Sequence, residues 1–127
     1  RWVEQGWRGP RWVLNISSGL GRYPMASQAP YCAAKAGLDH FTRCAALDQA
    51  QQPHGAKLVS LAPGVIDTDM QVQLRGADTS AFPDRERFVE LLRSGVLTSP
   101  QQAAARVLAW LDRPDFGRQP VADVRDA

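Results

Sequence analysis

Two short apolar segments separated by one long helical pattern constrain the fold of this chain more than any other feature. Residues 11–17 (RWVLNIS) are rich in apolar and β-branched side chains and end in SSGLG, which is typical of a strand followed by a turn. Residues 56–62 form a second apolar strand, which Pro63 and Gly64 interrupt. The order strand, helix, strand predicts a parallel α/β sheet.

The helix between these strands is predicted over residues 29–50. Pro30 fits its first turn, where a missing N–H is harmless, and the helix is predicted to stop near residues 53–55. Its apolar side chains recur at helical spacing, at Ala34, Leu38, Phe41 and Ala45.

The second half of the chain adds helices and one more strand. We predict a short helix over residues 66–74, a helix over 84–93, a helix over 99–113 and a third strand in RQPVADV, residues 118–124. Ser99 is predicted to cap the third of these helices. Its buried stripe is predicted to be Ala104, Val107, Leu108 and Leu111.

Three strands alone make a poor parallel sheet. Such a sheet needs cover on both faces, and the outer edge of the strand over 11–17 would stay unpaired. We therefore expect either that a partner supplies further strands or that the chain is part of something larger.

Composition narrows the classes of partner. The chain has 127 residues, 44% of them hydrophobic and 22% charged, and its formal net charge is only +2. The arginines are scattered from Arg1 to Arg125, so no nucleic-acid partner is expected. No apolar run approaches about 18 residues, and RWVEQGWRGP has no hydrophobic signal core, so no membrane partner is expected.

The cysteines and histidines point to no metal site. Cys32 and Cys44 lack CxxC spacing and fall in one predicted helix, and the two histidines share no ligand spacing with them. Unpaired thiols are typical of a reducing compartment, so we expect a cytoplasmic protein.

The motifs YCAAK and NISSG contain the candidate catalytic residues. Tyr31 and Lys35 stand four residues apart, so on a helix they share one face. A lysine ammonium near a phenol favours the ionised phenol, which lets Tyr31 exchange a proton with a carbonyl oxygen or an alcohol. Ser18, at the end of a strand, could hydrogen-bond the same oxygen. A chance pair on the surface is the alternative.

These motifs resemble a known family. NISSG, YCAAK and LVSLAPGVIDTDM are similar, in order and spacing, to the C-terminal half of classical short-chain dehydrogenases/reductases. The resemblance implies an α/β fold, the C-terminal part of a Rossmann-type doubly wound parallel sheet with three strands and flanking helices. Residues 1–127 would then be a single partial domain, the catalytic half, without the N-terminal half.

The resemblance also implies residue roles. Ser18 would orient the substrate carbonyl, Tyr31 would be the catalytic acid, and Lys35 would bind the nicotinamide ribose and make the tyrosine more acidic. The nicotinamide would lie against Pro63, Gly64, the backbone at Ile66 and the hydroxyl of Thr68. By the same likeness the cofactor is NADP (as NADPH) rather than NAD, the substrate is a small carbonyl compound, and the full-length relative is a homo-oligomer.

Within that family the chain resembles the sepiapterin reductase and benzil reductase-like branch. The similarity covers YCAAKAG, PGVIDTDMQ, the segment from SGVLTSP to RPDFG, and VADVRDA. It implies that Asp123 contacts the substrate by anchoring a pterin ring; an ordinary surface carboxylate is the alternative. Arg118 and Gln119 depart from the pattern, which has a small residue and glycine there.

The cofactor fingerprint of the family is missing. No glycine-rich turn for the pyrophosphate is present, because Gly19 and Gly21 are followed by Pro24 where a third glycine is needed. We therefore expect a complete homologue to reduce carbonyls with NAD(P)H, and this chain alone to be weakly active or inactive.

Two other hypotheses remain. A serine hydrolase would use Ser18 with His40 or His54 and Asp67, but the chain lacks a GxSxG elbow. A non-catalytic interaction or regulatory remnant would bind a partner through two surfaces. These are the edge of the strand over 11–17 and the helix face of Ala34, Leu38 and Phe41, with Trp2, Trp7 and Trp12 favouring such a surface.

Overall fold

The computed structural model describes residues 9–66, 85–93 and 97–126. In chain order the elements are β1 (Trp12–Ile16), the 3-10 turn η2 (Gly19–Gly21), α1 (Ala29–Ala50), β2 (Lys57–Ala62), α3 (Arg85–Arg93), α4 (Pro100–Leu111) and β3 (Val121–Asp123). Each strand and helix predicted in the described ranges is present. The predicted helix over 66–74 lies, apart from Ile66, outside the described residues.

The three strands form one parallel sheet in the order β1-β2-β3. Leu14 pairs with Val59, and Leu61 pairs with Ala122, so β2 lies between two neighbours. All but the first residue of β2 are buried, as expected for a central strand of a parallel sheet. The predicted parallel α/β sheet is therefore confirmed.

The outer edge of β1 has no neighbouring strand among the described residues. Trp12 is 49% exposed and Ile16 is 45% exposed, so this strand is only half-buried. The described part of the chain therefore has exposed apolar side chains on its outermost strand.

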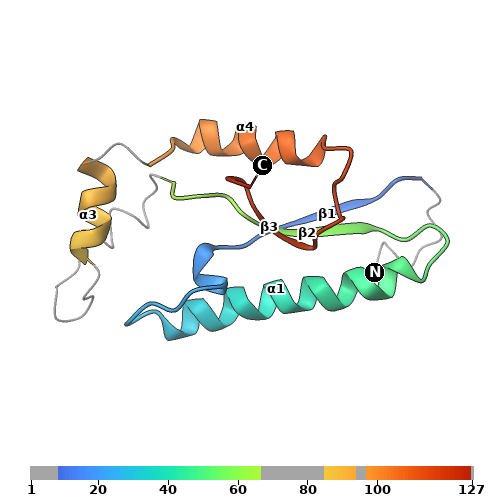
Figure 1. Cartoon of the computed structure of the whole chain (residues 1–127), viewed down its shortest axis with the longest axis horizontal. Helices are drawn as coiled ribbons and strands as arrows, with labels where there is room; N and C mark the ends of the chain where they lie inside the picture. The colour runs from blue at the N-terminus through green and yellow to red at the C-terminus, as the bar shows by residue number, and fades with distance from the viewer. Residues whose placement is uncertain (1–8, 67–84, 94–96, 127) are drawn as a thin grey trace.

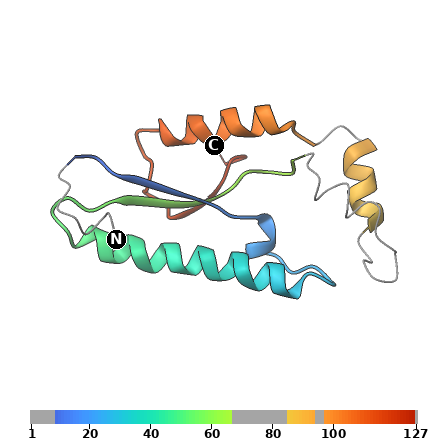
Figure 2. The same cartoon turned by 180° about the vertical axis from the view of Figure 1, so that it is seen from behind.

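Helix α4 covers one face of the sheet and α1 the other (Figures 1 and 2). The apolar core lies on the α4 face, where Val59 and Leu61 of β2 pack with Phe116 and Ala122. From α4, the side chains that pack against this core are Val107, Trp110 and Leu111.

Half of the predicted stripe of α4 is confirmed, because Val107 and Leu111 pack against the core, and the other half is wrong. Leu108 is 62% exposed and Ala104 is exposed, whereas Ala103 is buried. Residues 103–105 are all alanine, so the apolar pattern alone does not define which side of the helix faces the core.

The face by which α1 contacts the sheet also differs from the apolar pattern. Phe41 is 63% exposed and Ala34 is exposed, while Asp39 and Thr42 are buried. Asn15 Nδ2 donates a hydrogen bond of 3.1 Å to Thr42 Oγ1. At Asn15, Ser17 and Ser60, polar side chains from the sheet side contact polar side chains of α1.

The two covering helices begin differently. The Ser99 hydroxyl caps α4 by accepting from Gln102 N at 3.2 Å, and Gln102 Oε1 accepts from Ser99 N at 3.1 Å. This capping box confirms the predicted cap. Helix α1 begins after Gln28, whose side chain makes no cap hydrogen bond, and it has Pro30 in its first turn as predicted.

Both cysteines lie within the described ranges 9–66, 85–93 and 97–126. Cys32 and Cys44 are in α1 and are free thiols. No helix in these ranges combines the length and the apolar character needed to cross a membrane. The same ranges hold no group of three or more histidine, cysteine or acidic residues placed to bind a metal ion.

Candidate active site

The carboxyl ends of the three strands meet at one edge of the sheet. Ser17 follows β1 and donates its N–H to Leu61 O at 2.8 Å, and Val124 follows β3 and donates its N–H to Ala62 O at 3.0 Å. The segments after all three strands are thus held side by side. This edge is where open α/β sheets bind ligands.

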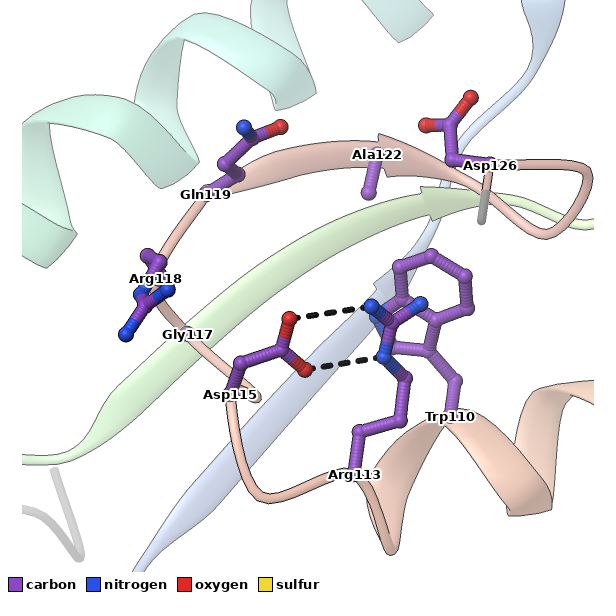
Figure 3. A pocket seen from close by; sticks show the side chains of 8 residues that line it. All are labelled: Trp110, Arg113, Asp115, Gly117, Arg118, Gln119, Ala122 and Asp126. Carbon is purple, nitrogen blue, oxygen red and sulfur yellow. Dashed lines mark hydrogen bonds and ion pairs between the residues drawn. The ribbon is translucent and has the colours of Figure 1, made fainter.

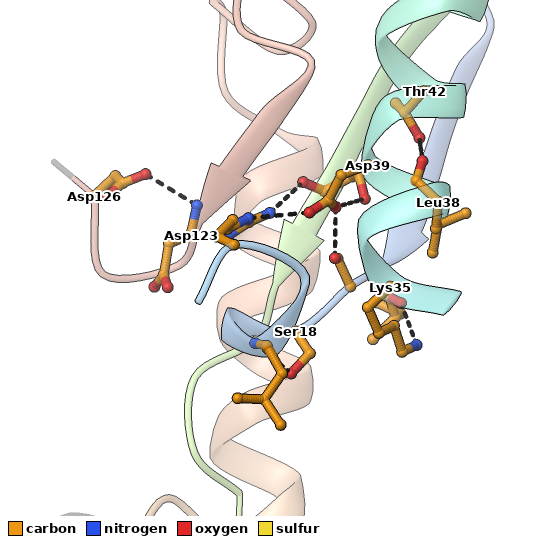
Figure 4. Close-up of polar contacts among 12 residues, drawn as sticks. Ser18, Lys35, Leu38, Asp39, Thr42, Asp123 and Asp126 are labelled. Carbon is orange, nitrogen blue, oxygen red and sulfur yellow. Dashed lines mark hydrogen bonds and ion pairs between the residues drawn. The ribbon is translucent and has the colours of Figure 1, made fainter. Parts of the chain in front are cut away.

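Ser18 lies at this edge, directly after β1. Its Oγ accepts a hydrogen bond of 3.2 Å from Leu20 N, which caps the 3-10 turn η2 (Figure 4). A serine hydroxyl has two acceptor lone pairs and one donor hydrogen. The cap uses one lone pair, so the hydroxyl hydrogen remains available for a carbonyl oxygen.

Lys35 brings a cation to the same strand end. Its Nζ donates a hydrogen bond of 2.9 Å to Ile16 O, the last carbonyl of β1, and lies 5.8 Å from the centre of the Tyr31 ring. Tyr31 and Lys35 are both half-buried in the first two turns of α1. The lysine therefore contacts the strand that leads to Ser18 and stands beside the phenol.

The Pro63–Gly64 turn follows β2. Gly64 has φ +82, in the left-handed region that favours glycine. A Cβ there would meet only Val124 Cγ2, at an ordinary 3.6 Å. The turn is held by Thr98, whose N and Oγ1 each lie 3.0 Å from Val65 O, and Ile66 forms a parallel bridge with Thr98. Thr68 lies outside the described residues.

Asp123 ends β3 and pairs in register with Ala62, just before the Pro63–Gly64 turn. Its carboxylate accepts from Arg125 Nε at 2.8 Å and from Arg125 Nη2 at 2.6 Å. These hydrogen bonds hold the pKa of Asp123 below its usual value. The residue thus lies at the predicted edge, but Arg125 occupies both of its oxygens.

Asp39 is a buried carboxylate next to this site, and the sequence did not predict it. It is 2% exposed and accepts hydrogen bonds from Ser17 Oγ, Ser60 Oγ and Arg22 Nε. It lies four residues after Lys35, so the spacing that joined Tyr31 to Lys35 extends to Asp39. This four-residue spacing is the sequence pattern from which Asp39 could have been predicted.

A polar hollow of about 200 Å³ lies elsewhere, between the end of α4 and β3 (Figure 3). Arg113 donates to Asp115 through Nε at 2.9 Å and Nη2 at 3.0 Å, and its guanidinium lies 4.1 Å from the Trp110 ring centre. These hydrogen bonds lower the pKa of Asp115. None of the predicted site residues lines this hollow. Its lining residues are Trp110, Arg113, Asp115, Gly117, Arg118, Gln119, Ala122 and Asp126.

The described contacts give no support to the hydrolase hypothesis. His40 and His54 are both exposed, and no hydrogen bond joins either of them to Ser18 in the described part of the chain. Asp67 lies outside the described residues.

Comparison with known proteins extends over most of the chain. Residues 10–79 match the family model of short chain dehydrogenases. The chain is 37% identical over 110 residues to benzil reductase ((S)-benzoin forming) of Bacillus cereus, covering 87% of this chain and 44% of the relative. It is 36% identical over 107 residues to sepiapterin reductase of Bos taurus, covering 84% of this chain and 38% of the relative.

A solved structure gives the same result for the fold. A short chain dehydrogenase/reductase from Saccharomyces cerevisiae superimposes with a TM-score of 0.73 at 26% identity, covering 91% of this chain and 46% of that one. The chain thus spans less than half the length of the relatives it matches. With the family match over residues 10–79, these likenesses show that the chain belongs to the short-chain dehydrogenase family.

Proposed function

We propose that this chain carries the catalytic half of an NAD(P)H-dependent carbonyl reductase, with Ser18, Tyr31 and Lys35 as the reacting set. The observation that carries the proposal is the lysine contact, 2.9 Å from Nζ to Ile16 O and 5.8 Å from Nζ to the Tyr31 ring centre. It puts one cation beside both the phenol and the strand that leads to Ser18. Membership of the family supports the same assignment.

The three side chains divide the work in this proposal. Tyr31 donates its phenolic proton to the carbonyl oxygen of the substrate. Ser18 donates a hydrogen bond to the same oxygen and stabilises the negative charge that develops there. The Lys35 ammonium lies 5.8 Å from the Tyr31 ring centre, and its N–H groups not bonded to Ile16 can hold a ribose hydroxyl.

The described residues fit the nicotinamide end of a dinucleotide, which would supply the hydride. The Pro63–Gly64 turn lies at the strand ends, and the α-carbon of Gly64 has space beside it. We propose that this turn, the backbone at Ile66 and the hydroxyl of Thr68 hold the nicotinamide. NADPH is proposed over NADH from the family resemblance alone.

The sequence holds no match to the pyrophosphate fingerprint, because Gly19 and Gly21 follow β1 but Pro24 stands where the third glycine is needed. We therefore propose that the chain by itself is weakly active or inactive. In the complete protein we expect a cytoplasmic homo-oligomer that acts on a small carbonyl compound, such as a diketone or a pterin. Asp123 is proposed to contact that substrate once Arg125 releases it.

A binding role is the second candidate, and exposed apolar surface favours it. Trp12, Ile16 and Phe41 are 49%, 45% and 63% exposed. A regulatory remnant of the family would use these side chains to bind a protein partner without turnover.

Binding and turnover measurements separate the two candidates. NADPH and NADH binding and the reduction of benzil and sepiapterin are measured for this chain and for the longest protein its gene encodes. Activity only in the longer protein is the expected result, and tight cofactor binding by the 127 residues would contradict the proposal. Absence of turnover from both forms would favour the binding role.

A matched pair of tyrosine variants tests the mechanism. Tyr31→Phe in the longer protein is expected to abolish turnover because it removes the proton donor. Tyr23→Phe changes a tyrosine that is 72% exposed, and it is expected to leave the rate unchanged. Full activity of Tyr31→Phe would overturn the mechanism.

A further inference from the structure

The Asp39 carboxylate is the centre of the buried polar contacts between α1 and the sheet (Figure 4). Oδ1 accepts from Ser17 Oγ at 2.5 Å and from Ser60 Oγ at 2.7 Å, and Oδ2 accepts from Arg22 Nε at 3.3 Å. A buried carboxylate with three donors is firmly positioned, because losing any one of them leaves a buried polar group unpaired.

Two of these donors, Ser17 and Arg22, come from the two ends of one short segment. Ser17 is directly before Ser18, and Arg22 directly follows the η2 turn. The segment over 17–22, which includes Ser18, is therefore fixed at two points to one side chain of α1. Arg22 Nη2 also donates to Ser60 O at 3.3 Å, which joins β2 to the same network.

Helix geometry connects the network to the reacting pair. Asp39 lies one turn after Lys35 and two turns after Tyr31, on the same face of α1. The backbone at Gly21 lies directly against this face, because a Cβ there would lie 2.6 Å from Asp39 Oδ2 and 3.0 Å from the Lys35 carbonyl carbon.

We propose that Asp39 is a positioning residue, which sets the place of Ser18 relative to Tyr31 and Lys35. It acts through the segment over 17–22 and does not itself contact the substrate. This inference rests on the proposed function of those three residues.

The first test is Asp39→Asn in the longest protein that the gene encodes. The amide nitrogen of asparagine is a donor where the network needs acceptors, so the bond to Arg22 or those to the two serines are lost. A misplacement of about 1 Å at a reacting group costs up to about 100-fold in rate, so kcat is expected to fall about 10- to 100-fold. The dissociation constant of NADPH is expected to stay within about twofold, because Asp39 is not among the residues proposed to hold it.

A double-mutant cycle with Ser18→Ala distinguishes positioning from general structural support. If Asp39 acts through Ser18, the loss caused by Asp39→Asn shrinks to less than about threefold when Ser18 is already alanine. Equal losses in both backgrounds would overturn the inference.

Gly21→Ala disturbs the same contact without changing the carboxylate. The added methyl group displaces Asp39 or the segment, and a comparable fall in kcat is expected. Gly19→Ala is the control, because a Cβ at Gly19 meets nothing within 4 Å. If the two glycine variants have the same kcat, the inference is wrong. The comparison of the two glycine variants tests the inference even if the Asp39→Asn protein does not fold.

Hydrogen exchange gives a readout that needs no turnover. The amides of Leu20, Arg22 and Tyr23 are hydrogen-bonded within this segment, and Asp39→Asn is expected to lower their protection at least about tenfold. Amides of α4 are expected to be unaffected. Unchanged protection at all three would refute the positioning role, whatever Tyr31→Phe does. If Asp39→Asn lowers the protection of these amides while Tyr31→Phe keeps full turnover, the proposed function is wrong but the positioning role of Asp39 is not contradicted.

Discussion

The two faces of the sheet are held by different chemistry. Toward α4, β2 presents Val59 and Leu61, which pack in an apolar core. Toward α1, β2 presents the hydroxyl group of Ser60 and the residue after β1 presents that of Ser17, and both are hydrogen-bonded to Asp39. Apolar packing depends mainly on area and volume, whereas hydrogen bonds require defined directions. The face against α1, the helix that holds Tyr31 and Lys35, is therefore the one whose geometry is most narrowly defined.

The largest effect is expected on the apolar face. Leu61→Ala removes a side chain that is 0% exposed and leaves a cavity, which should lower the free energy of unfolding by about 2–5 kcal/mol. Leu108→Ala, at a position 62% exposed on α4, should change it by less than about 0.5 kcal/mol. Urea denaturation measures both. Similar losses from the two variants would contradict the core described for this face.

A smaller loss is expected on the polar face. Ser60→Ala removes a buried donor to the Asp39 carboxylate, and hydrogen bonds to charged groups contribute about 1.5–3 kcal/mol. Ser27→Ala removes an exposed hydroxyl and serves as the control. Denaturation curves would reveal the difference. If Ser60→Ala is neutral, the polar face contributes no directional restraint and the contrast fails.

The two helices that cover the sheet, α4 and α1, also differ at their N-terminal ends. Ser99→Ala breaks the capping box of α4 and should cost about 1 kcal/mol. Gln28→Ala should cost little, because the Gln28 side chain makes no cap hydrogen bond to α1. Melting temperatures of the two variants give the comparison. An equal decrease would show that α1 depends on its first turn as much as α4 does.

The smallest effect is expected at the edge that the two faces share. Arg125→Gln removes the hydrogen bonds that lower the pKa of Asp123, so that pKa should rise toward its ordinary value of about 3.9. Because the folded pKa is lowered, the pair contributes stability above about pH 4, which is lost as the pH falls through the folded pKa.

The contribution of this pair should not exceed about 1 kcal/mol, because the Arg125 side chain is 65% exposed. NMR titration of the Asp123 carboxyl carbon tests the shift. Arg113→Gln breaks a different ion pair and should leave the pKa of Asp123 unchanged. An unshifted pKa in Arg125→Gln would remove Arg125 as its cause.

Element order was readable from the sequence because strong local signals bound the elements. Pro30 starts a helix, and the Pro63–Gly64 turn ends the central strand, whatever the rest of the fold does. The pair Tyr31 and Lys35 was predicted from its four-residue spacing on that helix. The hydrogen bond from Lys35 to β1 depends on the tertiary structure, which the spacing does not give.

The orientation of each helix was less predictable, for physical reasons. Phe41 marked the apolar side of α1, yet the sheet beneath offers hydroxyl groups, so Asp39 and Thr42 face it instead. Whether a buried aspartate is satisfied depends on partners 17 to 22 residues away in the chain. Likewise, the pairing of Asp123 with Arg125 depends on the turn that follows β3.

The open edge of β1 also affects how this chain behaves at high concentration. Its backbone N–H and C=O groups on that side have no strand partner in the described ranges, and Trp12 and Ile16 add exposed apolar surface there. Such an edge is a template for intermolecular strand pairing, the first step of aggregation. Trp12→Lys would put a charge on the strand at this edge, which is expected to oppose that step.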